Sequence, residues 1–438
     1  MKTITPLENE PSARSPRIGE TVTLHGMLYK IREMSGFAFL LLQTRAQLFQ
    51  CVWSPDFSGF PLEGLRPGSA VEVTGLVAAE PRSRAGFELR LLTCQVLNRP
   101  VPEEPPVVVN NREIPASLET LLDYRPLTLR HQKERAIFRV QSALCAGFRQ
   151  YLLENGFTEI HTPKLVSGGA EGGTEVFTFD YFGHPACLAQ SPQLYKQMLT
   201  GVFERVFEIA PAFRAEKHDT ARHINEYTSV DLEMGFVRSF YDIMRTETAL
   251  IRSALAYVRE SCAEELRLLG AEVPEIAAIP SLPFDEAKAK IAARFHRPIT
   301  DPLDFDPEEE KLLGMLIKEE TDSDFVFVTH YRSAKRPFYT MDTPGNPEVT
   351  ESFDLLFRGM EVTTGGQRIH DWQTQTNKLR ARGIDPAAFE SYLSAHRYGL
   401  PPHGGLGIGL ERFTARLLGF DNVRRTTLFP RDTHRLTP

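Results

Sequence analysis

Residues 207–236 read FEIAPAFRAEKHDTARHINEYTSVDLEMGF, and this stretch predicts two strands joined by a polar loop. Arg214 and Glu216 stand at alternate positions of the first strand, so both side chains point to the same face. The loop and the returning strand add Arg222, His223, Tyr227, Asp231 and Glu233. Because the planar guanidinium of Arg can bond two oxygens at once, the hairpin indicates a site for phosphate or carboxylate. A solvated hairpin with cross-strand ion pairs would give the same spacing, and the residues alone leave both interpretations open.

A second informative stretch, PPHGGLGIGLERF at residues 401–413, places four glycines before an apolar helix expected at 410–418. Glycines let a backbone approach a ligand closely, and the start of the helix would bring Arg412 and backbone N–H groups to it. The pattern is neither a Walker loop nor GxGxxG. The alternative is a tight packing junction between a turn and a helix.

The surrounding segments predict two domains and a linker. Residues 22–31, 37–42, 48–53, 71–78 and 87–96 read as five short strands with glycine-containing turns, which is typical of a small barrel of the oligonucleotide-binding type. The stretch 98–116 holds five prolines and has no helical or strand period. We therefore expect a barrel at 1–100, a linker at 101–116 and a mixed α+β domain at 117–438. A barrel without any ligand is the alternative for the first domain.

The larger domain should begin with an amphipathic helix. Between residues 132 and 155 apolar side chains recur at helical spacing, and Gly156 ends the pattern as a left-handed cap. Further strands are expected at 206–209, 228–236, 325–328 and 352–357, and a largely helical stretch at 239–269. The acidic run 304–310 indicates the cap of a surface helix.

Composition excludes several other classes of protein. The chain has 438 residues and a formal net charge of −7, which argues against a protein that coats polyanions such as DNA. Its five cysteines lie more than 40 residues apart, so no disulfide framework or CxxC pair is available. The N-terminal segment lacks the apolar core of a signal peptide, and the most apolar uncharged stretch, residues 35–44, is too short to span a bilayer. We expect a cytoplasmic protein without membrane or DNA partners.

Arg214, Glu216, the glycine-rich helix start and Arg412 occur in an order that resembles motifs 2 and 3 of the class II aminoacyl-tRNA synthetases. FTEIHTP at residues 157–163, a strand that follows a long helix and ends in proline, resembles motif 1 of the same family. This resemblance implies a homodimer that forms through motif 1.

Two further stretches resemble the amino-acid pocket of aspartyl-tRNA synthetases: AQSPQLYKQ at 189–197 and FDLLFRGMEVTTGGQR at 353–368. The resemblance covers nearly the whole chain, from the barrel to LFPRD at 428–432. The interval between motifs 2 and 3 leaves no room for the large extra domain of the common bacterial form. The chain is therefore similar to the compact archaeal and eukaryotic type.

The resemblance implies an α+β fold in which a five-stranded barrel binds the anticodon and an antiparallel sheet flanked by helices carries catalysis. Aspartate would react with ATP to give aspartyl-adenylate and pyrophosphate, and the aspartyl group would pass to the 3′ end of tRNA-Asp. Catalysis would depend mainly on in-line positioning and on neutralisation of charge by Arg and Mg²⁺. ATP is the implied second substrate and Mg²⁺ the implied metal.

By match to the family's motifs, Arg214 and Arg412 are the expected catalytic residues. Arg214 would bridge the substrate α-carboxylate and the α-phosphate. The residues expected at ATP are Arg214, Glu216, Arg222, His223, Tyr227, Glu361, Gly409, Glu411 and Arg412. Oxygen ligands suit Mg²⁺, and those expected are Asp354, Glu361 and Thr364. The pair Thr363–Thr364 stands where relatives usually have two serines.

An aspartate side chain that enters a dry pocket needs paired cations, and the family pattern places Lys196 and Arg368 there, with Asp231 orienting them. The residues expected at aspartate are Glu171, Ser191, Gln193, Lys196, Arg214, Asp231, Thr364 and Arg368. Of these, Glu171, Ser191 and Gln193 would accept hydrogen bonds from the α-amino group. The alternative for Lys196 is an ordinary lysine on a helix surface.

The residues expected to contact the anticodon are Tyr29, Arg32, Phe37, Phe39, Gln50 and Arg84. Phe37 and Phe39 would stack on unpaired bases, although phenylalanine in a small barrel is more often part of the core. Tyr29 and Arg84 match positions that differ between relatives with strict and relaxed tRNA choice, and they fit neither pattern. Whether tRNA-Asn is charged together with tRNA-Asp is therefore open.

Three rival functions remain to be weighed. An asparaginyl-tRNA synthetase would not need Lys196 and Arg368 for a neutral side chain, and a lysyl enzyme would need acidic residues at those two positions. A non-catalytic RNA-binding paralogue would be expected to have lost Arg214, Glu361 or Arg412, and all three are present.

Overall fold

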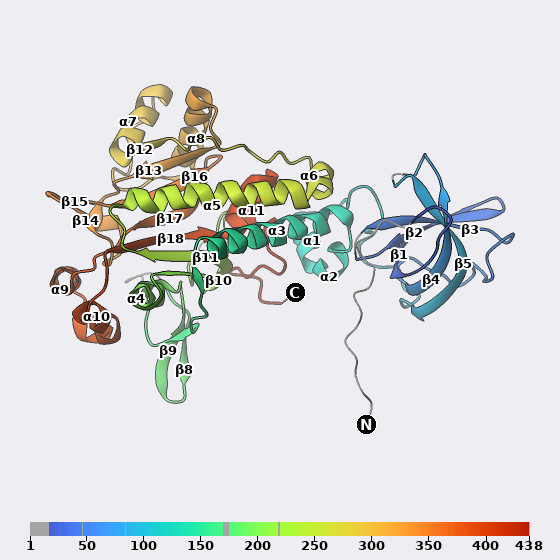
Figure 1. Ribbon diagram of the computed structural model, residues 1–438, viewed down its shortest axis with the longest axis horizontal. Helices are drawn as coiled ribbons and strands as arrows, with labels where there is room; N and C mark the ends of the chain where they lie inside the picture. The colour runs from blue at the N-terminus through green and yellow to red at the C-terminus, as the bar shows by residue number, and fades with distance from the viewer. Residues whose placement is uncertain (1–16, 46, 84, 170–174, 218–219, 438) are drawn as a thin grey trace. The chain divides into compact units, whose positions relative to one another are not determined.

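The computed structural model describes residues 17–45, 47–83, 85–169, 175–217 and 220–437. The chain forms two compact units, residues 1–115 and 116–438 (Figure 1). Two expected site residues, Arg84 and Glu171, lie outside the described residues. No helix in the described part of the chain is long and apolar enough to span a membrane.

The first unit contains a closed barrel with the strand order β1-β2-β3-β5-β4, which confirms the predicted five-stranded barrel. The strands are β1 (Thr21–Met34), β2 (Phe37–Gln43), β3 (Leu48–Trp53), β4 (Ala70–Ala79) and β5 (Phe87–Asn98). Buried and half-exposed positions alternate along β2 and β4, so every second side chain enters the core. Ala38 and Leu40 fill this core from β2.

Part of the segment expected as a linker returns to strand β1. The hydroxyl of Tyr29 donates to the carbonyl oxygen of Val109 over 2.6 Å, and Nζ of Lys30 donates to that of Asn110 over 3.2 Å. Tyr29 is 8% exposed, and burial raises its pKa to about 12. The chain therefore stays bonded to the barrel well beyond residue 101, where the linker was expected to begin.

The second unit is built on an eight-stranded sheet with the order β12-β13-β16-β17-β18-β11-β10-β6. Its strands are β6 (Thr158–Glu159), β10 (Arg205–Phe213), β11 (Glu226–Gly235), β12 (Ser281–Pro283), β13 (Phe325–Thr329), β16 (Ser352–Phe357), β17 (Glu361–Gln367) and β18 (His403–Gly409). Only the two edge pairs, β6 with β10 and β12 with β13, are parallel. The predicted antiparallel sheet is confirmed, with parallel strands added at its edges.

The glycine-rich stretch is a strand, not a turn. β18 lies between β11 and β17 in the middle of the sheet, and helix α11 (Leu410–Leu418) starts directly at its end. The glycines are needed for packing, because a Cβ on Gly404 would lie 2.3 Å from Cδ1 of Ile243 in the helix that covers the sheet. The predicted helix at 410–418 is confirmed.

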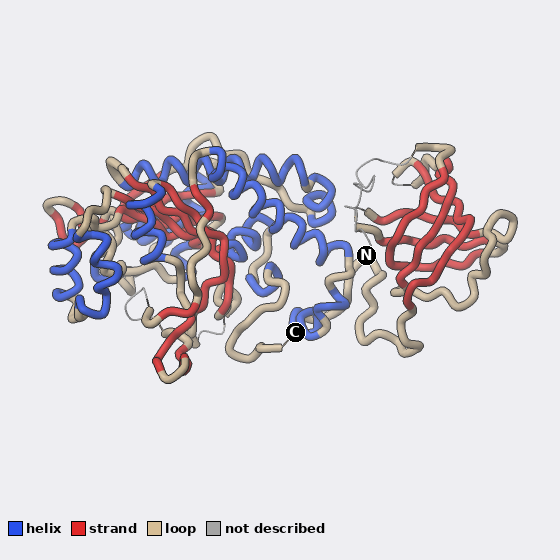
Figure 2. The backbone as a smooth tube through the Cα atoms, turned by 60° about the horizontal axis from the view of Figure 1, so that its bottom comes forward, coloured by secondary structure: helices blue, strands red, loops and turns tan. Residues whose placement is uncertain are grey.

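Helices α3 (Gln132–Glu154) and α5 (Phe240–Ser261) lie side by side across one face of this sheet (Figures 1 and 2). They approach closely because Gly147 has no side chain: a Cβ there would lie 2.8 Å from the Cα of Ala254. The main hydrophobic core, which includes Phe148 and Phe353, joins these helices to the sheet. The predicted helical stretch 239–269 is broken at Cys262, after which α6 (Ala263–Leu269) begins.

The remaining elements surround this framework. The helices are α1 (Leu118–Asp123), α2 (Arg125–Thr128), α4 (Gln193–Phe203), α7 (Phe284–Phe295), α8 (Pro307–Thr321), α9 (Trp372–Ala381) and α10 (Glu390–Arg397), with the 3₁₀ turns η1 (Ser333–Lys335), η2 (Pro386–Phe389) and η3 (Val423–Thr426). The short strands are β7 (Leu165–Val166), β8 (Thr178–Tyr181), β9 (His184–Leu188), β14 (Asp342–Thr343) and β15 (Asn346–Thr350).

Glu247, a buried carboxyl on α5, should make the stability of the protein depend on pH. Burial raises its pKa to about 8, so the folded protein keeps a proton there that the unfolded chain has already lost. Stability therefore falls as the pH rises from the unfolded pKa toward 8. We compare the melting temperatures of Glu247→Gln and wild type at each pH. The difference, variant minus wild type, should increase by a few degrees as the pH is raised from about 5 to about 8.

The matched control is Glu260→Gln, which removes an exposed carboxyl near the end of the same helix. Its melting temperature relative to wild type should change little over the same pH range. A Glu247→Gln difference that stays constant with pH would contradict the raised pKa.

Candidate active site

A cavity of about 530 Å³ is lined by residues from β11, β16, β17, β18, α4, the loop that follows β10 and the segment 331–340. Every expected catalytic, ATP, aspartate or metal residue within the described part of the chain lines it: Ser191, Gln193, Lys196, Arg214, Glu216, Arg222, His223, Tyr227, Asp231, Asp354, Glu361, Thr364, Arg368, Gly409, Glu411 and Arg412. These residues lie up to 221 positions apart in the chain, between Ser191 and Arg412, and the sheet brings them together.

Alternation along β11 explains how one strand serves both the core and the cavity. Val230 and Leu232 point into the hydrophobic core, whereas Ser229 and Asp231 line the cavity. Successive side chains of a strand point to opposite faces. The face of the sheet that is not covered by α3 and α5 is therefore the one that carries the site.

Lys196 and Arg368 both line the cavity and are both buried. Nζ of Lys196 donates to Oδ1 of Asp231 over 2.7 Å, and Nε of Arg368 donates to Oε1 of Glu233 over 3.0 Å. Lys196 is 1% exposed, so it is not an ordinary lysine on a helix surface. Nζ of Lys196 also lies 3.6 Å from Oε2 of Glu233, which joins the two pairs into one cluster.

Glu233 was not among the expected site residues, although it stands two positions after Asp231 on β11 and so shares its face. Gly405 makes room for it, because a Cβ there would lie 2.2 Å from Oε2 of Glu233. Nη2 of Arg368 donates to the carbonyl oxygen of the same glycine over 2.9 Å. Two buried cations thus face two buried carboxylates in a network whose formal charges cancel.

Among the polar atoms of the described residues that have no hydrogen-bond partner, three belong to this network or to the neighbouring Gln193. They are Oδ2 of Asp231 and Oε2 of Glu233, both acceptors, and Nε2 of Gln193, a donor. Buried polar groups are normally satisfied, so these atoms indicate a place for a polar ligand. Asp231 and Gln193 both line the cavity.

Arg214, another lining residue, lies beside Tyr227, with its Cζ 5.7 Å from the ring centroid. Nη1 of Arg214 lies 3.8 Å from Oε1 of Glu216. Asn225, which the sequence analysis did not single out, holds both residues by donating from Nδ2 to the carbonyl oxygens of Arg214 (2.7 Å) and Glu216 (2.9 Å). The arrangement offers a cation, a carboxylate and an aromatic face to one ligand.

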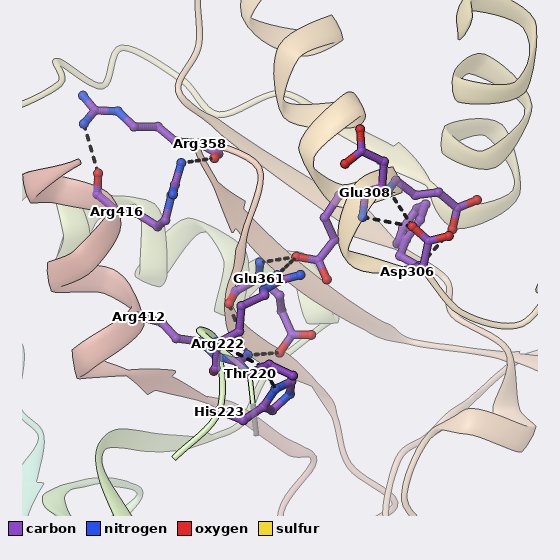
Figure 3. Close-up of polar contacts among 12 residues, drawn as sticks. Thr220, Arg222, His223, Asp306, Glu308, Arg358, Glu361, Arg412 and Arg416 are labelled. Atoms are coloured by element: carbon purple, nitrogen blue, oxygen red, sulfur yellow. Dashed lines mark hydrogen bonds and ion pairs between the residues drawn. The ribbon is translucent and has the colours of Figure 1, made fainter. Parts of the chain in front are cut away.

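Glu411 and Arg412 lie in the first turn of helix α11, but their side chains have different surroundings. Both carboxylate oxygens of Glu411 accept hydrogen bonds from the backbone N–H of Thr228 at 3.0 Å, and burial raises its pKa to about 7. Its carboxylate therefore ties α11 to β11. Arg412 instead lies beside Glu361 in the cavity, with Nη1 3.6 Å from Oε1 (Figure 3).

The expected metal ligands converge where β16 and β17 pair, with Asp354 directly opposite Thr364. Oγ1 of Thr364 donates to Oε1 of Glu361 over 3.3 Å, and the Glu361 side chain is 37% exposed. Asp354 is buried and forms an ion pair with Arg336 over 2.7 Å between Nη2 and Oδ2. Burial raises the pKa of Asp354, and the guanidinium opposes that shift.

This donor set fits Mg²⁺ in part. Glu361 and Thr364 offer the hard oxygens that the ion prefers, whereas Arg336, which the sequence analysis missed, already neutralises Asp354. No cluster of three His, Cys, Asp or Glu side chains suited to a metal occurs in the described residues. Mg²⁺ often binds through one or two carboxylates together with substrate phosphates, which is the arrangement that these residues allow.

Comparison with known protein families shows which family the chain belongs to. Residues 117–433 match the model of the family described as tRNA synthetases class II (D, K and N). The chain belongs to the class II tRNA synthetases. Enzymes of this class use ATP to activate an amino acid.

Among the similar class II synthetases are two bacterial proteins, each named Aspartate–tRNA(Asp/Asn) ligase. The protein of Deinococcus radiodurans is 47% identical over 426 residues, which is 96% of each chain. That of Thermus thermophilus is 47% identical over 425 residues, covering 96% of this chain and 97% of its own. The protein of Thermococcus kodakarensis, named Aspartate–tRNA(Asp) ligase, is 39% identical over 433 residues.

Solved class II synthetases share the fold. The asparaginyl-tRNA synthetase from Pyrococcus horikoshii complexed with asparaginyl-adenylate has a TM-score of 0.88 and 32% identity, covering 96% of this chain and 97% of that one. A putative aspartyl-tRNA synthetase from Leishmania major has a TM-score of 0.84 and 28% identity, covering 98% and 94%.

On the barrel of this synthetase, Phe37 and Phe39 lie on the outer face of β2, since the residues between and after them form the core. Their rings meet edge to face with centroids 5.3 Å apart, and Arg32 on β1 is paired opposite Phe39. Gln50 is half-exposed and donates to Oε2 of Glu88 over 3.3 Å. Tyr29, which was also expected at the anticodon, is instead buried, and its hydroxyl donates a hydrogen bond to the carbonyl oxygen of Val109.

Proposed function

We propose that the chain is an aspartate–tRNA ligase, which activates L-aspartate with ATP and transfers the aspartyl group to the 3′ end of tRNA-Asp and tRNA-Asn. The observation that carries the proposal is the buried pair Lys196 and Arg368 in a cavity that Arg214 and Arg412 also line. The names of the two relatives with 47% identity support it.

The main competing amino acid is asparagine, because a solved asparaginyl-tRNA synthetase has the same fold. That enzyme shares 32% of residues with this chain, whereas the relatives named as aspartate ligases share up to 47%. Lys196 and Arg368 offer only N–H donors, so both oxygens of a carboxylate can accept charge-assisted hydrogen bonds from them, whereas the NH₂ group of an amide would face these donors without an acceptor. The cations therefore favour aspartate.

Binding of aspartate would be organised by the charge cluster. Lys196 and Arg368 would donate to the β-carboxylate, while Asp231 and Glu233 keep both cations in place. Ser191, Gln193 and Glu171 would bind the α-amino group. Because the ion pairs of Lys196 with Asp231 and of Arg368 with Glu233 orient the two cations before the substrate arrives, little reorganisation would be needed when charge develops.

Activation would occur beside Arg214, which would contact both the α-carboxylate and the α-phosphate and so align the attack. Tyr227 and Arg412 would enclose the adenine, and Glu216 would accept from its amino group. Arg222 and His223 would bind the outer phosphates. Glu361 and Thr364 would hold Mg²⁺, which when bound neutralises charge on the phosphates.

The remaining parts of the proposal concern tRNA and assembly. On the outer side of the barrel, Arg32 is exposed and Phe37, Phe39 and Gln50 are half-exposed, a combination of aromatic and polar groups that suits unpaired anticodon bases. The strand of the 157–163 segment, β6, is the last strand of its sheet, and we place the dimer contact there. The cytoplasm, where tRNA is charged, is the proposed location.

Removing either buried cation should strongly reduce the rate of aspartate-dependent ATP–pyrophosphate exchange. Loss of one partner of a desolvated charge pair costs about 2–5 kcal/mol, which corresponds to a rate at least about thirtyfold lower. The variants are Lys196→Met and Arg368→Met, and the measurement is exchange of labelled pyrophosphate into ATP.

The control is Lys288→Met, which removes another buried lysine, paired with Glu309 over 2.7 Å and absent from the cavity lining. Its exchange rate per folded molecule should stay close to wild type. Normal exchange in Lys196→Met would rule out the pocket as proposed.

Charging should extend to both tRNAs. Transcripts with GUC and GUU anticodons should be aspartylated at comparable rates, since the two relatives with 47% identity are both named for tRNA(Asp/Asn). The measurement is aspartate incorporation into each transcript under identical conditions. Charging of the GUC transcript alone would restrict the function to tRNA-Asp.

Phe37→Ala should weaken tRNA charging but leave adenylate formation intact. Stacking on an aromatic ring contributes about 1–3 kcal/mol per base, so KM for tRNA should rise by a factor between about 5 and about 150. Leu97→Ala, which truncates an exposed apolar side chain on β5, is the control and should leave this KM unchanged. Equal loss of charging and of ATP–pyrophosphate exchange would instead indicate a folding defect.

A further inference from the structure

Helix α8 begins with three consecutive glutamates that have different surroundings. Glu308 is exposed, whereas Glu309 is buried and bonded to Nζ of Lys288. Asp306 caps the helix by accepting from the backbone N–H groups of Glu308 and Glu309, each at 2.9 Å. Asp306 therefore serves as the helix cap, and Glu309 is the partner of Lys288. Neither of these roles explains Glu310, which is 9% exposed.

Two glycines bring Glu310 to the active site. A Cβ on Gly314 would lie 2.6 Å from both the N and the Cα of Gly359, so helix α8 touches the turn between β16 and β17 backbone to backbone. Gly359 has a φ of 73°, in the left-handed region that glycine adopts without strain. Residues four apart share a helix face, so Glu310 lies one turn before this contact, next to the first residues of β17.

From this position Glu310 contacts two of the residues proposed for ATP and Mg²⁺. Its Oε2 accepts from the backbone N–H of Glu361 over 2.8 Å, and the same carboxylate forms an ion pair with the guanidinium of Arg222. The side chains of both Arg222 and Glu310 are largely buried. One carboxylate thus joins the polar loop after β10 to the strand that carries Glu361.

Arg412 contacts the same two residues, Arg222 and Glu361. Its Nε donates to the carbonyl oxygen of Arg222 over 3.3 Å, and its Nη1 donates to that of Glu361 over 3.4 Å (Figure 3). The three cavity residues Arg222, Glu361 and Arg412 are therefore linked to one another, and Glu310 supports two of them from outside the cavity lining. Glu310 does not itself line the cavity.

We propose that Glu310 is a positioning residue for ATP: it holds Arg222 in the orientation that binds the outer phosphates and fixes the backbone of Glu361. The proposal rests on the function proposed above. A long arginine side chain loses rotamer freedom when it binds a ligand. If a fixed partner already restricts the side chain in the free enzyme, less entropy is lost when the ligand binds. The guanidinium has five N–H donors, so an ion pair through Nη2 leaves others for a phosphate.

The test is the isosteric variant Glu310→Gln. Its amide oxygen can still accept from Glu361, but the side chain no longer carries the charge that holds Arg222. KM for ATP in the exchange reaction, and Kd for Mg·ATP by titration calorimetry, should both rise about tenfold, as expected for the loss of one charge-assisted contact. KM for aspartate and the melting temperature should stay near wild type, which a merely structural role would not predict.

The matched control is Glu308→Gln, which removes the same charge from the same helix turn at an exposed position. It should leave both ATP constants unchanged. If Glu308→Gln weakens ATP binding as much as Glu310→Gln, the effect is general electrostatics and the proposal fails.

A double-mutant cycle tests whether Glu310 acts through Arg222. Arg222→Gln combined with Glu310→Gln should bind ATP no more weakly than Arg222→Gln alone, because residues in one network are not additive. Additive losses would overturn the proposal. So would tighter ATP binding by Glu310→Gln, which would show that Glu310 withholds Arg222 from phosphate.

The calorimetric titration separates this proposal from the proposed function. If the wild-type protein shows no aspartate-dependent exchange, the proposed function fails, and the Mg·ATP affinities of the variants still decide the role of Glu310. If exchange is normal in wild type and ATP affinity is unchanged in Glu310→Gln, only the positioning role fails.

Discussion

The site depends on burying four charges without leaving any of them unpaired. Moving a single ion out of water costs several kcal/mol even after relaxation, so Lys196 and Arg368 can be buried only because Asp231 and Glu233 face them. The cluster draws its members from α4, from β11 and from Arg368, which follows directly after β17. Loss of one member would therefore disturb the packing of these elements together with the recognition of aspartate that we propose.

The glycines of β18 are what allow that cluster to exist in the middle of the sheet. Gly405 leaves the space that the Glu233 carboxylate occupies, and its carbonyl oxygen receives a hydrogen bond from Arg368. Gly404, whose missing side chain would point to the other face, leaves space for the side chain of Ile243 of α5. The same strand thus accommodates polar groups on one side and the hydrophobic core on the other, which accounts for glycine where a central strand would ordinarily carry branched apolar residues.

Local periodicity predicted the framework well, because the barrel strands, α3 and the β10–β11 pair follow repeats that one face of burial imposes. Local periodicity did not predict site residues whose hydrogen-bond or ion-pair partners lie far away in the sequence. Nothing near Glu310 distinguishes it from Glu308 and Glu309, since its partners Arg222 and Glu361 lie on other elements. Asn225 and Arg336 escaped notice for the same reason. The outward orientation of Phe37 and Phe39 depends on strand register, and β18 appeared to be a turn because strand propensity disfavours glycine.

The hydrogen bonds of Tyr29 and Lys30 to the chain after β5 bear on how the barrel can be produced as an isolated fragment. A truncation at residue 100 would remove Val109 and Asn110, leaving the Tyr29 hydroxyl and the Lys30 amine without these two acceptors. A fragment that ends at residue 115, the boundary of the compact unit, keeps both. The smallest self-sufficient barrel is therefore longer than its five strands.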